Sequence, residues 1–123
     1  MDDRATAKVL DALGDPTRRA VLELIRGGAR PVGAIAAELP VSRPAVSQHL
    51  HVLKEAGLVR DRKDGTRRLY SLDPHGLEEL RRYLEGFWDS ALVAFRDAAE
   101  DDEAERSEAG GNRAKGNRKG AQR

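Results

Sequence analysis

The apolar positions in the first part of the chain recur with the 3.6-residue period of an α-helix. This pattern predicts a helix over residues 4–13 and a second helix that begins at Pro16 and stops at Gly27. A short helix follows over residues 32–39 and ends before Pro40, which cannot continue it. The apolar stripes of these three helices are Val9, Leu10 and Leu13; Val21, Leu22, Leu24 and Ile25; and Val32, Ile35, Ala36 and Leu39.

A fourth predicted helix is apolar on one side and polar on the other. Ser42 is suited to cap its start, because a serine oxygen can accept a hydrogen bond from an N–H of the first turn, and Gly57 provides a stop. At about 100° per residue, Leu50 and Leu53 lie within about 40° of Val46 and form the apolar side. The opposite side and its edges consist of Arg43, Pro44, Ser47, Gln48, His51, Lys54 and Glu55.

The period of the pattern shortens to about two over residues 58–72, which indicates β-strands. The pair Asp64–Gly65 lies between two runs of β-forming residues, and such a pair is a strong signal for a two-stranded hairpin. The arms of this hairpin are rich in cations, namely Arg60, Arg62, Lys63, Arg67 and Arg68.

A long helix is predicted from Pro74 to about Glu100. Its large apolar residues step by three or four positions, which is typical of a coiled-coil-like seam rather than of a broad core-facing stripe. The seam either packs on the first helix of its own chain or forms a homodimer, and we expect the homodimer because so small a monomer has little else to cover it. The predicted dimer interface consists of Val9, Leu10, Leu13, Leu80, Leu84, Phe87, Trp88, Ala91, Leu92 and Phe95.

The chain of 123 residues is long enough for one domain with a modest core. We expect this domain to cover residues 1–100. Residues 101–123 are predicted to be a disordered, charged tail, because they include no large apolar residue whose burial could offset the cost of ordering them. No apolar run approaches the roughly 18 residues of a membrane span, and the acidic start lacks the apolar region of a secretory signal, so we expect a cytoplasmic protein.

Charge is unevenly distributed along the chain, although the net charge is only +1. Residues 1–100 hold 16 basic and 16 acidic side chains, whereas residues 41–72 hold seven basic and three acidic ones. A local basic stretch indicates a surface for a polyanion, and its ordinary alternative is a solvated charged face. The last fifteen residues hold five basic side chains and no acidic one, which either attract phosphate non-specifically or keep the end soluble.

The order of the predicted elements favours DNA as the polyanion. A short helix followed within about three to four residues by a second helix is a helix-turn-helix, and the hairpin behind it makes a winged helix. The second helix of such a unit enters the major groove, where glutamine can bond an adenine edge and arginine a guanine edge. We therefore expect Arg43, Ser47, Gln48 and His51 to contact bases. The predicted contacts to the DNA backbone come from Lys54, Arg60, Arg62, Lys63, Arg67 and Arg68.

Three segments resemble the ArsR-type winged-helix transcriptional repressors: "LGDPTRRAVLELI", "SRPAVSQHLHVLKEAGLV" and "RLYSL". The resemblance covers about residues 5–100. It implies a mainly α fold with a small β-hairpin wing, and a homodimer that represses its own promoter region until a signal releases it. By motif position, the resemblance assigns DNA reading to Ser42, Arg43, Pro44, Ser47, Gln48 and His51.

Metal-sensing members of that family carry cysteines before the turn, or clusters of His, Asp and Glu along the last helix. This chain has no cysteine, which also excludes disulfides and cysteine nucleophiles. His75 with Asp73 does not supply the three or four ligands of a metal site, and His49 lies near the apolar side of its helix, as a structural histidine does. We therefore expect no metal and no cofactor, as in the metal-independent subgroup, although a metal-responsive repressor remains an alternative.

Two other classes of protein compete with a DNA-binding regulator. Ser47, His51 and Glu55 share one face, but a convex helix surface offers neither a pocket nor an oxyanion site, so an enzyme is not expected. A winged-helix module that binds only proteins would have a neutral or acidic hairpin, whereas this hairpin is basic. The sequence therefore predicts a transcriptional regulator that acts on an inverted-repeat operator.

Overall fold

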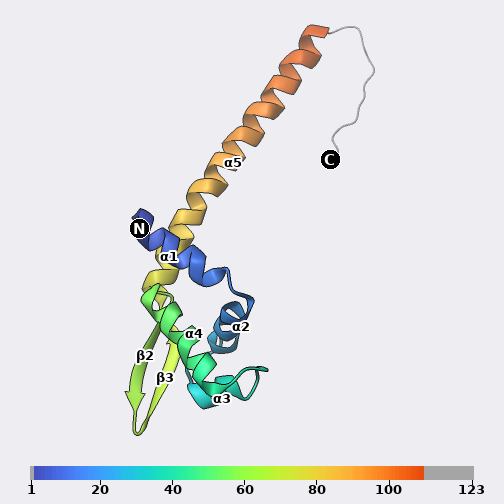
Figure 1. Cartoon of the computed structure of the whole chain (residues 1–123). Coiled ribbons are helices and arrows are strands. Elements are labelled where there is room, and N and C mark those ends of the chain that lie inside the picture. The colour runs from blue at the N-terminus through green and yellow to red at the C-terminus, as the bar shows by residue number, and fades with distance from the viewer. Residues whose placement is uncertain (1, 110–123) are drawn as a thin grey trace. The chain divides into compact units, whose positions relative to one another are not determined.

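The computed structural model of the protein describes residues 2–109 and is mainly helical, with a small antiparallel sheet (Figure 1). The chain divides into two compact units, Met1–Leu84 and Glu85–Arg123, and the last helix contributes to both. None of the described helices is long and apolar enough to cross a membrane. In chain order the elements are α1 (Asp3–Leu13), α2 (Pro16–Ile25), β1 (Arg30–Pro31), α3 (Val32–Ala36), α4 (Arg43–Glu55), β2 (Val59–Asp64), β3 (Arg67–Leu72) and α5 (Pro74–Ala109). This order confirms the predicted winged helix-turn-helix.

The core of the first unit is built from the apolar stripes that the sequence predicts. α4 turns Val46, Leu50 and Leu53 inward, and none of the three is more than 1% exposed. Burial of each such side chain contributes about 1.5–3 kcal/mol relative to an exposed one, so this face holds α4 in place. The buried core residues are Val9, Ala12, Val21, Ile25, Ile35, Val46, Leu50, Leu53, Leu58 and Val59.

One predicted interface residue belongs to this core instead. α1 packs on α2 and α4, and it buries Val9 to 2% exposure while its neighbour Leu10 stays 46% exposed. The prediction that Val9 lies in a dimer interface is therefore wrong, because its own protomer covers it. The two residues are adjacent in one apolar stripe, so the spacing alone could not separate the covered one from the exposed one.

The connection between the two helices of the helix-turn-helix is longer than predicted. α3 ends at Ala36 rather than near residue 39, because two N–H groups beyond its end donate to carbonyls three residues earlier and turn the chain before Pro40. Ser42 then caps α4 as predicted, and its hydroxyl oxygen accepts a hydrogen bond from the Ala45 N–H at 3.2 Å. The turn and the cap together fix where the first residues of α4 lie.

The sheet has three strands in the order β1–β3–β2, all antiparallel. β2 and β3 form the predicted hairpin, and Asp64 and Arg67 are its last pair. The two turn residues are therefore Gly65 and Thr66, one position beyond the pair from which the hairpin is predicted. Gly65 has φ +66°, which suits glycine at the first position of a tight hairpin turn. β1 was not predicted, because two residues are too few to show an alternating pattern.

The first turn of α5 is fixed against the end of α4 by two glycines. A Cβ atom on Gly76 would lie 1.7 Å from the carbonyl oxygen of Gly57, so only glycine allows this approach. Gly57 itself has φ +84°, in the left-handed region that favours glycine after a helix. Nearby, the Asp73 N–H donates to the Leu58 carbonyl at 2.9 Å. The start of α5 and the end of α4 are thus held together by backbone contacts.

α5 continues to Ala109, beyond the end that the apolar pattern predicts near Glu100. The prediction of disorder is therefore wrong for residues 101–109. That prediction weighed only the absence of large apolar residues, whereas the glutamate, alanine and arginine residues of this segment favour a helix without burial. The rest of the predicted tail, residues 110–123, lies outside the described residues.

Candidate nucleic-acid interface

α4 presents all the predicted base-reading residues on its exposed surface. Residues three and four positions apart lie on the same side of a helix, so the burial of Val46, Leu50 and Leu53 turns the intervening positions outward. The exposed residues of the base-reading set are Ser42, Arg43, Pro44, Ser47, Gln48 and His51. The polar face that the sequence pattern predicts is therefore present and open.

Three of these side chains have unused hydrogen-bonding groups. The side chains of Ser47, Gln48 and His51 form no hydrogen bond or ion pair with any other residue that the structure describes. A glutamine amide has both a donor and an acceptor, and hydroxyl and imidazole groups can also do both. The middle of the exposed face is thus equipped to bond the edges of bases.

The two polar residues at the start of α4 are partly engaged within the protein. The Ser42 oxygen caps the helix, which leaves its hydroxyl proton available to a ligand. The Arg43 guanidinium lies over α3, at van der Waals distance (3.5 Å) from the position that a Cβ atom on Gly33 would take. Arg43 therefore joins the two helices of the motif, and it would have to leave α3 to reach deep into a groove.

The cations of α4 and the hairpin divide into two groups. The Nζ of Lys54 lies 2.8 Å from one carboxylate oxygen of Asp61, and a guanidinium nitrogen of Arg68 lies 2.9 Å from the other. Arg67 has a looser partner, the carboxylate of Asp64 at 3.5 Å. No ion pair to another described residue is present for the remaining cations, which are Arg43, Arg60, Arg62 and Lys63.

Asp61 is the residue that the sequence analysis missed. Its side chain is only 8% exposed, and the hydrogen bond from Lys54 is the largest influence that lowers the pKa of its carboxyl group. The charges of Lys54 and Arg68 add to this effect, while burial opposes it. A signal was available: along a strand, every second residue faces the same way, so Asp61 falls on the side of the buried Val59.

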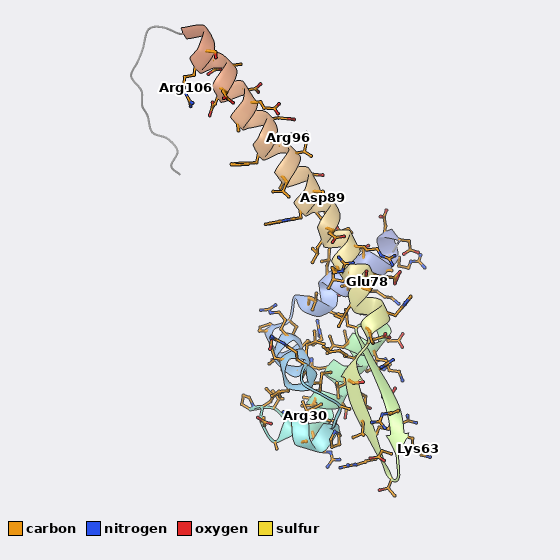
Figure 2. All side chains as sticks on the ribbon, turned by 180° about the vertical axis from the view of Figure 1, so that it is seen from behind. Arg30, Lys63, Glu78, Asp89, Arg96 and Arg106 are labelled. Atoms are coloured by element: carbon orange, nitrogen blue, oxygen red, sulfur yellow. The ribbon has the colours of Figure 1, made fainter. Side chains whose placement is uncertain are left out.

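The register of the hairpin places its cations on both faces. Residues directly opposite each other share a face, so Lys63 and Arg68 lie on the side of Asp61. The other face carries Arg60, Arg62 and Arg67, the last paired with Asp64. Figure 2 labels Lys63 toward the turn of the hairpin. Phosphate groups approaching the hairpin from either side would meet positive charge.

The remaining predicted interface residues differ in exposure. In the first unit, Leu13 and Leu80 are partly buried against the core, whereas Leu10 and Leu84 are exposed. In the second unit, α5 exposes a series of large apolar side chains, which are Phe87, Trp88, Leu92, Val93 and Phe95, and Ala91 is exposed among them. Val93 is the one member of this series that the seam did not include. Large apolar side chains gathered on one helix are typical of an interaction surface.

Among residues 2–109, no group of three or more His, Cys, Asp or Glu side chains is placed to hold a metal ion. His49 is half-buried and contributes to the lowered pKa of Asp15, whose main cause is the hydrogen bond from the Arg18 backbone N–H. His49 therefore lies by the start of α2 rather than on the open face of α4. This position agrees with its reading as a structural histidine.

Comparison with known proteins identifies the family to which this site belongs. Residues 13–62, which run from the end of α1 to the middle of β2, match the family described as "Helix-turn-helix domain". The chain is 50% identical over 99 residues to the HTH-type transcriptional regulator Rv2034 of Mycobacterium tuberculosis, a match that covers 80% of this chain and 92% of that protein. It is 37% identical over 79 residues to the transcriptional repressor SdpR of Bacillus subtilis, with 64% and 88% covered.

Among solved structures, the homodimeric winged helix-turn-helix DNA-binding domain of Mb0332 from Mycobacterium bovis, a possible ArsR-family regulator, matches with a TM-score of 0.58 and 30% identity. This match covers 72% of this chain and 88% of that domain. The chain belongs to the ArsR family of transcriptional regulators. As a member of this family it is a DNA-binding regulator of transcription, which confirms the function predicted from the helix, turn and basic hairpin.

Proposed function

We propose that this ArsR-family regulator is a repressor that binds an inverted-repeat operator as a homodimer, with α4 in the major groove. The observation that carries the proposal is the open polar face of α4, on which the side chains of Ser47, Gln48 and His51 have no partner within the described residues. The similarity to SdpR of Bacillus subtilis, a transcriptional repressor, supports the direction of regulation.

The base-reading role belongs to the exposed residues in the first two turns of α4. Gln48 is suited to an adenine edge, because its amide can donate to one ring position and accept from another. Arg43 is suited to a guanine edge once its guanidinium leaves α3. The shorter Ser47 and the imidazole of His51 supply further bonds on the same face, and Ser42 and Pro44 lie at its start.

The hairpin contacts the DNA backbone or the minor groove. Its cations without an ion-pair partner among the described residues, Arg60, Arg62 and Lys63, are the ones most able to bind phosphate. Arg67 can follow them, since its partner Asp64 lies at 3.5 Å and is exposed. Lys54 and Arg68 make a smaller contribution because Asp61 already neutralises part of their charge.

The homodimer forms through α1 and α5. Leu10 on α1 and Leu84, Phe87, Trp88, Ala91, Leu92 and Phe95 on α5 are exposed in the protomer. Burying aromatic side chains of this size against a second copy removes a large apolar area from water. The homodimeric state of the Mycobacterium bovis domain supports this assembly. A two-fold dimer sets two recognition helices about one DNA turn apart, which calls for an inverted repeat.

A salt titration of binding to the DNA upstream of the protein's own gene tests the proposal. We expect tight binding to that duplex, weaker binding to a random duplex of equal length and base composition, and a steep fall of both affinities with salt. Equal affinity for the two duplexes would contradict sequence-specific reading by α4. Absence of binding to either would contradict the proposed operator and leave a role as a protein-interaction module.

A further inference from the structure

The wing contains two carboxylates in different surroundings. The side chain of Asp64, at the turn, is 49% exposed and has one ion-pair partner at 3.5 Å. The side chain of Asp61, near the middle of β2, is 8% exposed and lies 2.8 Å from Lys54 and 2.9 Å from Arg68. Asp61 thus bridges α4, β2 and β3, whereas Asp64 joins only the two ends of its turn.

The bridge restrains the two cations that it holds. A carboxylate largely removed from water depends on its charged partners, because an uncompensated buried charge is strongly unfavourable. Lys54 and Arg68 keep about half of their side-chain surface exposed, at 50% and 55%, so a phosphate could approach them. To bind that phosphate with full strength, however, Lys54 and Arg68 would have to break their ion pairs with Asp61.

We propose that Asp61 limits the affinity for DNA of every sequence, because it withholds Lys54 and Arg68 from the phosphate backbone. Asp61 acts through these two cations rather than by touching DNA, and it is therefore a positioning residue. The inference rests on the proposed function, since it presumes that α4 and the hairpin face the duplex.

The physical reason is that attraction to phosphate carries no sequence information. Each phosphate that a protein neutralises strengthens its binding to every sequence alike, whereas bonds from the α4 face to base edges favour one sequence. Two cations kept on a carboxylate of the protein therefore weaken binding to the operator and to random DNA by a similar factor, and discrimination between the two is left to the base contacts of α4. With fewer phosphates neutralised, binding to either duplex also depends less steeply on salt.

The test compares Asp61→Asn with Asp64→Asn in the full chain. Both variants remove one negative charge from the same hairpin with little change of shape. Affinity is measured by fluorescence anisotropy for the upstream duplex and for a random duplex over a range of salt concentrations. We expect Asp61→Asn to bind random DNA more tightly, with a salt slope steeper by about 0.9 for each cation set free in each protomer. Its affinity for the upstream duplex rises by a similar factor, and Asp64→Asn changes the slope and the two affinities less.

Two results would overturn the proposal. If Asp61→Asn keeps the wild-type slope and affinities, or changes them no more than Asp64→Asn does, the two cations are not withheld. If Asp61→Asn weakens binding to both duplexes and flattens the slope, Asp61 serves only to hold the wing in a binding position. In either case, wild-type binding to the upstream duplex shows that the proposed function itself stands, whereas its absence counts against that function.

A second pair of variants applies if Asp61→Asn proves unfolded in circular dichroism and thermal unfolding. Arg62→Gln and Arg68→Gln each remove one cation from the hairpin, but only Arg68 is held by Asp61. We expect Arg62→Gln to flatten the salt slope by about 0.9 per protomer and Arg68→Gln by less than half as much. Equal flattening by the two variants would overturn the proposal.

Discussion

Two helices of this molecule have the same apolar spacing and opposite surroundings. On α4, Leu50 is 1% exposed and its stripe is covered by the rest of the first unit. In the second unit, α5 leaves Trp88 67% and Phe95 74% exposed. The apolar stripe of α4 is buried within one protomer, and the face of the helix that remains exposed is polar. On α5, by contrast, the apolar stripe itself is exposed.

This difference distinguishes the role of a single protomer from the role of a pair of protomers. Because α4 is fixed by its own core, its polar face is ready to meet DNA without any partner. Because the seam of α5 is uncovered, that part of the helix gains stability only when another surface covers it. We infer that reading the bases is a property of the protomer, and that spacing two reading helices is a property of the pair.

The largest expected difference between the two helices follows from truncating one leucine in each apolar stripe. Leu50→Ala should lower the free energy of unfolding by about 2–5 kcal/mol, because it leaves a cavity in a closed core. Leu92→Ala, at a position 52% exposed, should change it by about 0.5 kcal/mol or less at concentrations where the protein is monomeric. Urea denaturation at micromolar concentration measures both, and equal losses would contradict the contrast.

The next effect concerns the seam alone. Trp88→Ala should weaken the homodimer by about 2 kcal/mol or more, roughly 30-fold in the dissociation constant, because tryptophan is a typical anchor of protein interfaces. Sedimentation equilibrium measures this constant. Unfolding of the diluted monomer should be unchanged, which serves as the control. A variant that remains as dimeric as the wild type would show that Trp88 lies outside the interface.

A smaller effect is expected for substitutions on the polar face of α4. Gln48→Ala should reduce discrimination at one base pair of each half-site by about 1–3 kcal/mol, since it removes bonds to a base edge. Arg62→Ala should weaken binding to operator and random duplexes alike, because it removes a phosphate contact. Competition binding with singly substituted operators separates the two. The division of roles fails if both variants lower the operator affinity and the random affinity by the same factor.

The smallest effect is a pH dependence of stability from the Asp61 bridge. The pKa of Asp61 is lowered from its ordinary value of 3.8, chiefly by the hydrogen bond from Lys54. The carboxylate therefore stabilises the fold above that ordinary value, and this stability is lost as the pH falls through the lower folded value. The difference in unfolding free energy between wild type and Asp61→Asn should be constant near neutral pH and shrink below about pH 4. Urea denaturation across this range would contradict the account if the difference did not change.

Much of the fold could be predicted because local signals agreed with the tertiary structure. The cap at Ser42, the buried stripe of α4 and the turn around Gly65 are all visible in the sequence, and all are present. The failures arose where the sequence pattern lacked the deciding information. Val9 and Leu10 share one stripe, and only packing tells which is covered. The last turns of α5 follow helix propensity, which an account based on apolar burial does not include.

The candidate site could be predicted as a set of residues but not as a set of contacts. Ser47, Gln48 and His51 lie on the open face as their helical positions require. The engagement of Lys54 depends on Asp61, which approaches α4 only when β2 folds beside it. The amino-acid composition alone does not show which cations are available to bind phosphate. The fold shows which of them already has a carboxylate, and that is the information on which phosphate binding depends.

The most direct test of the central claim is selection of duplexes from a random pool by the full-length protein, followed by sequencing. If the face of α4 reads bases and α5 pairs the protomers, the selected sequences should form an inverted repeat whose half-sites are about 10 base pairs apart, centre to centre. Selection of a single unrepeated site, or no enrichment of any sequence, would contradict a dimer of two reading helices.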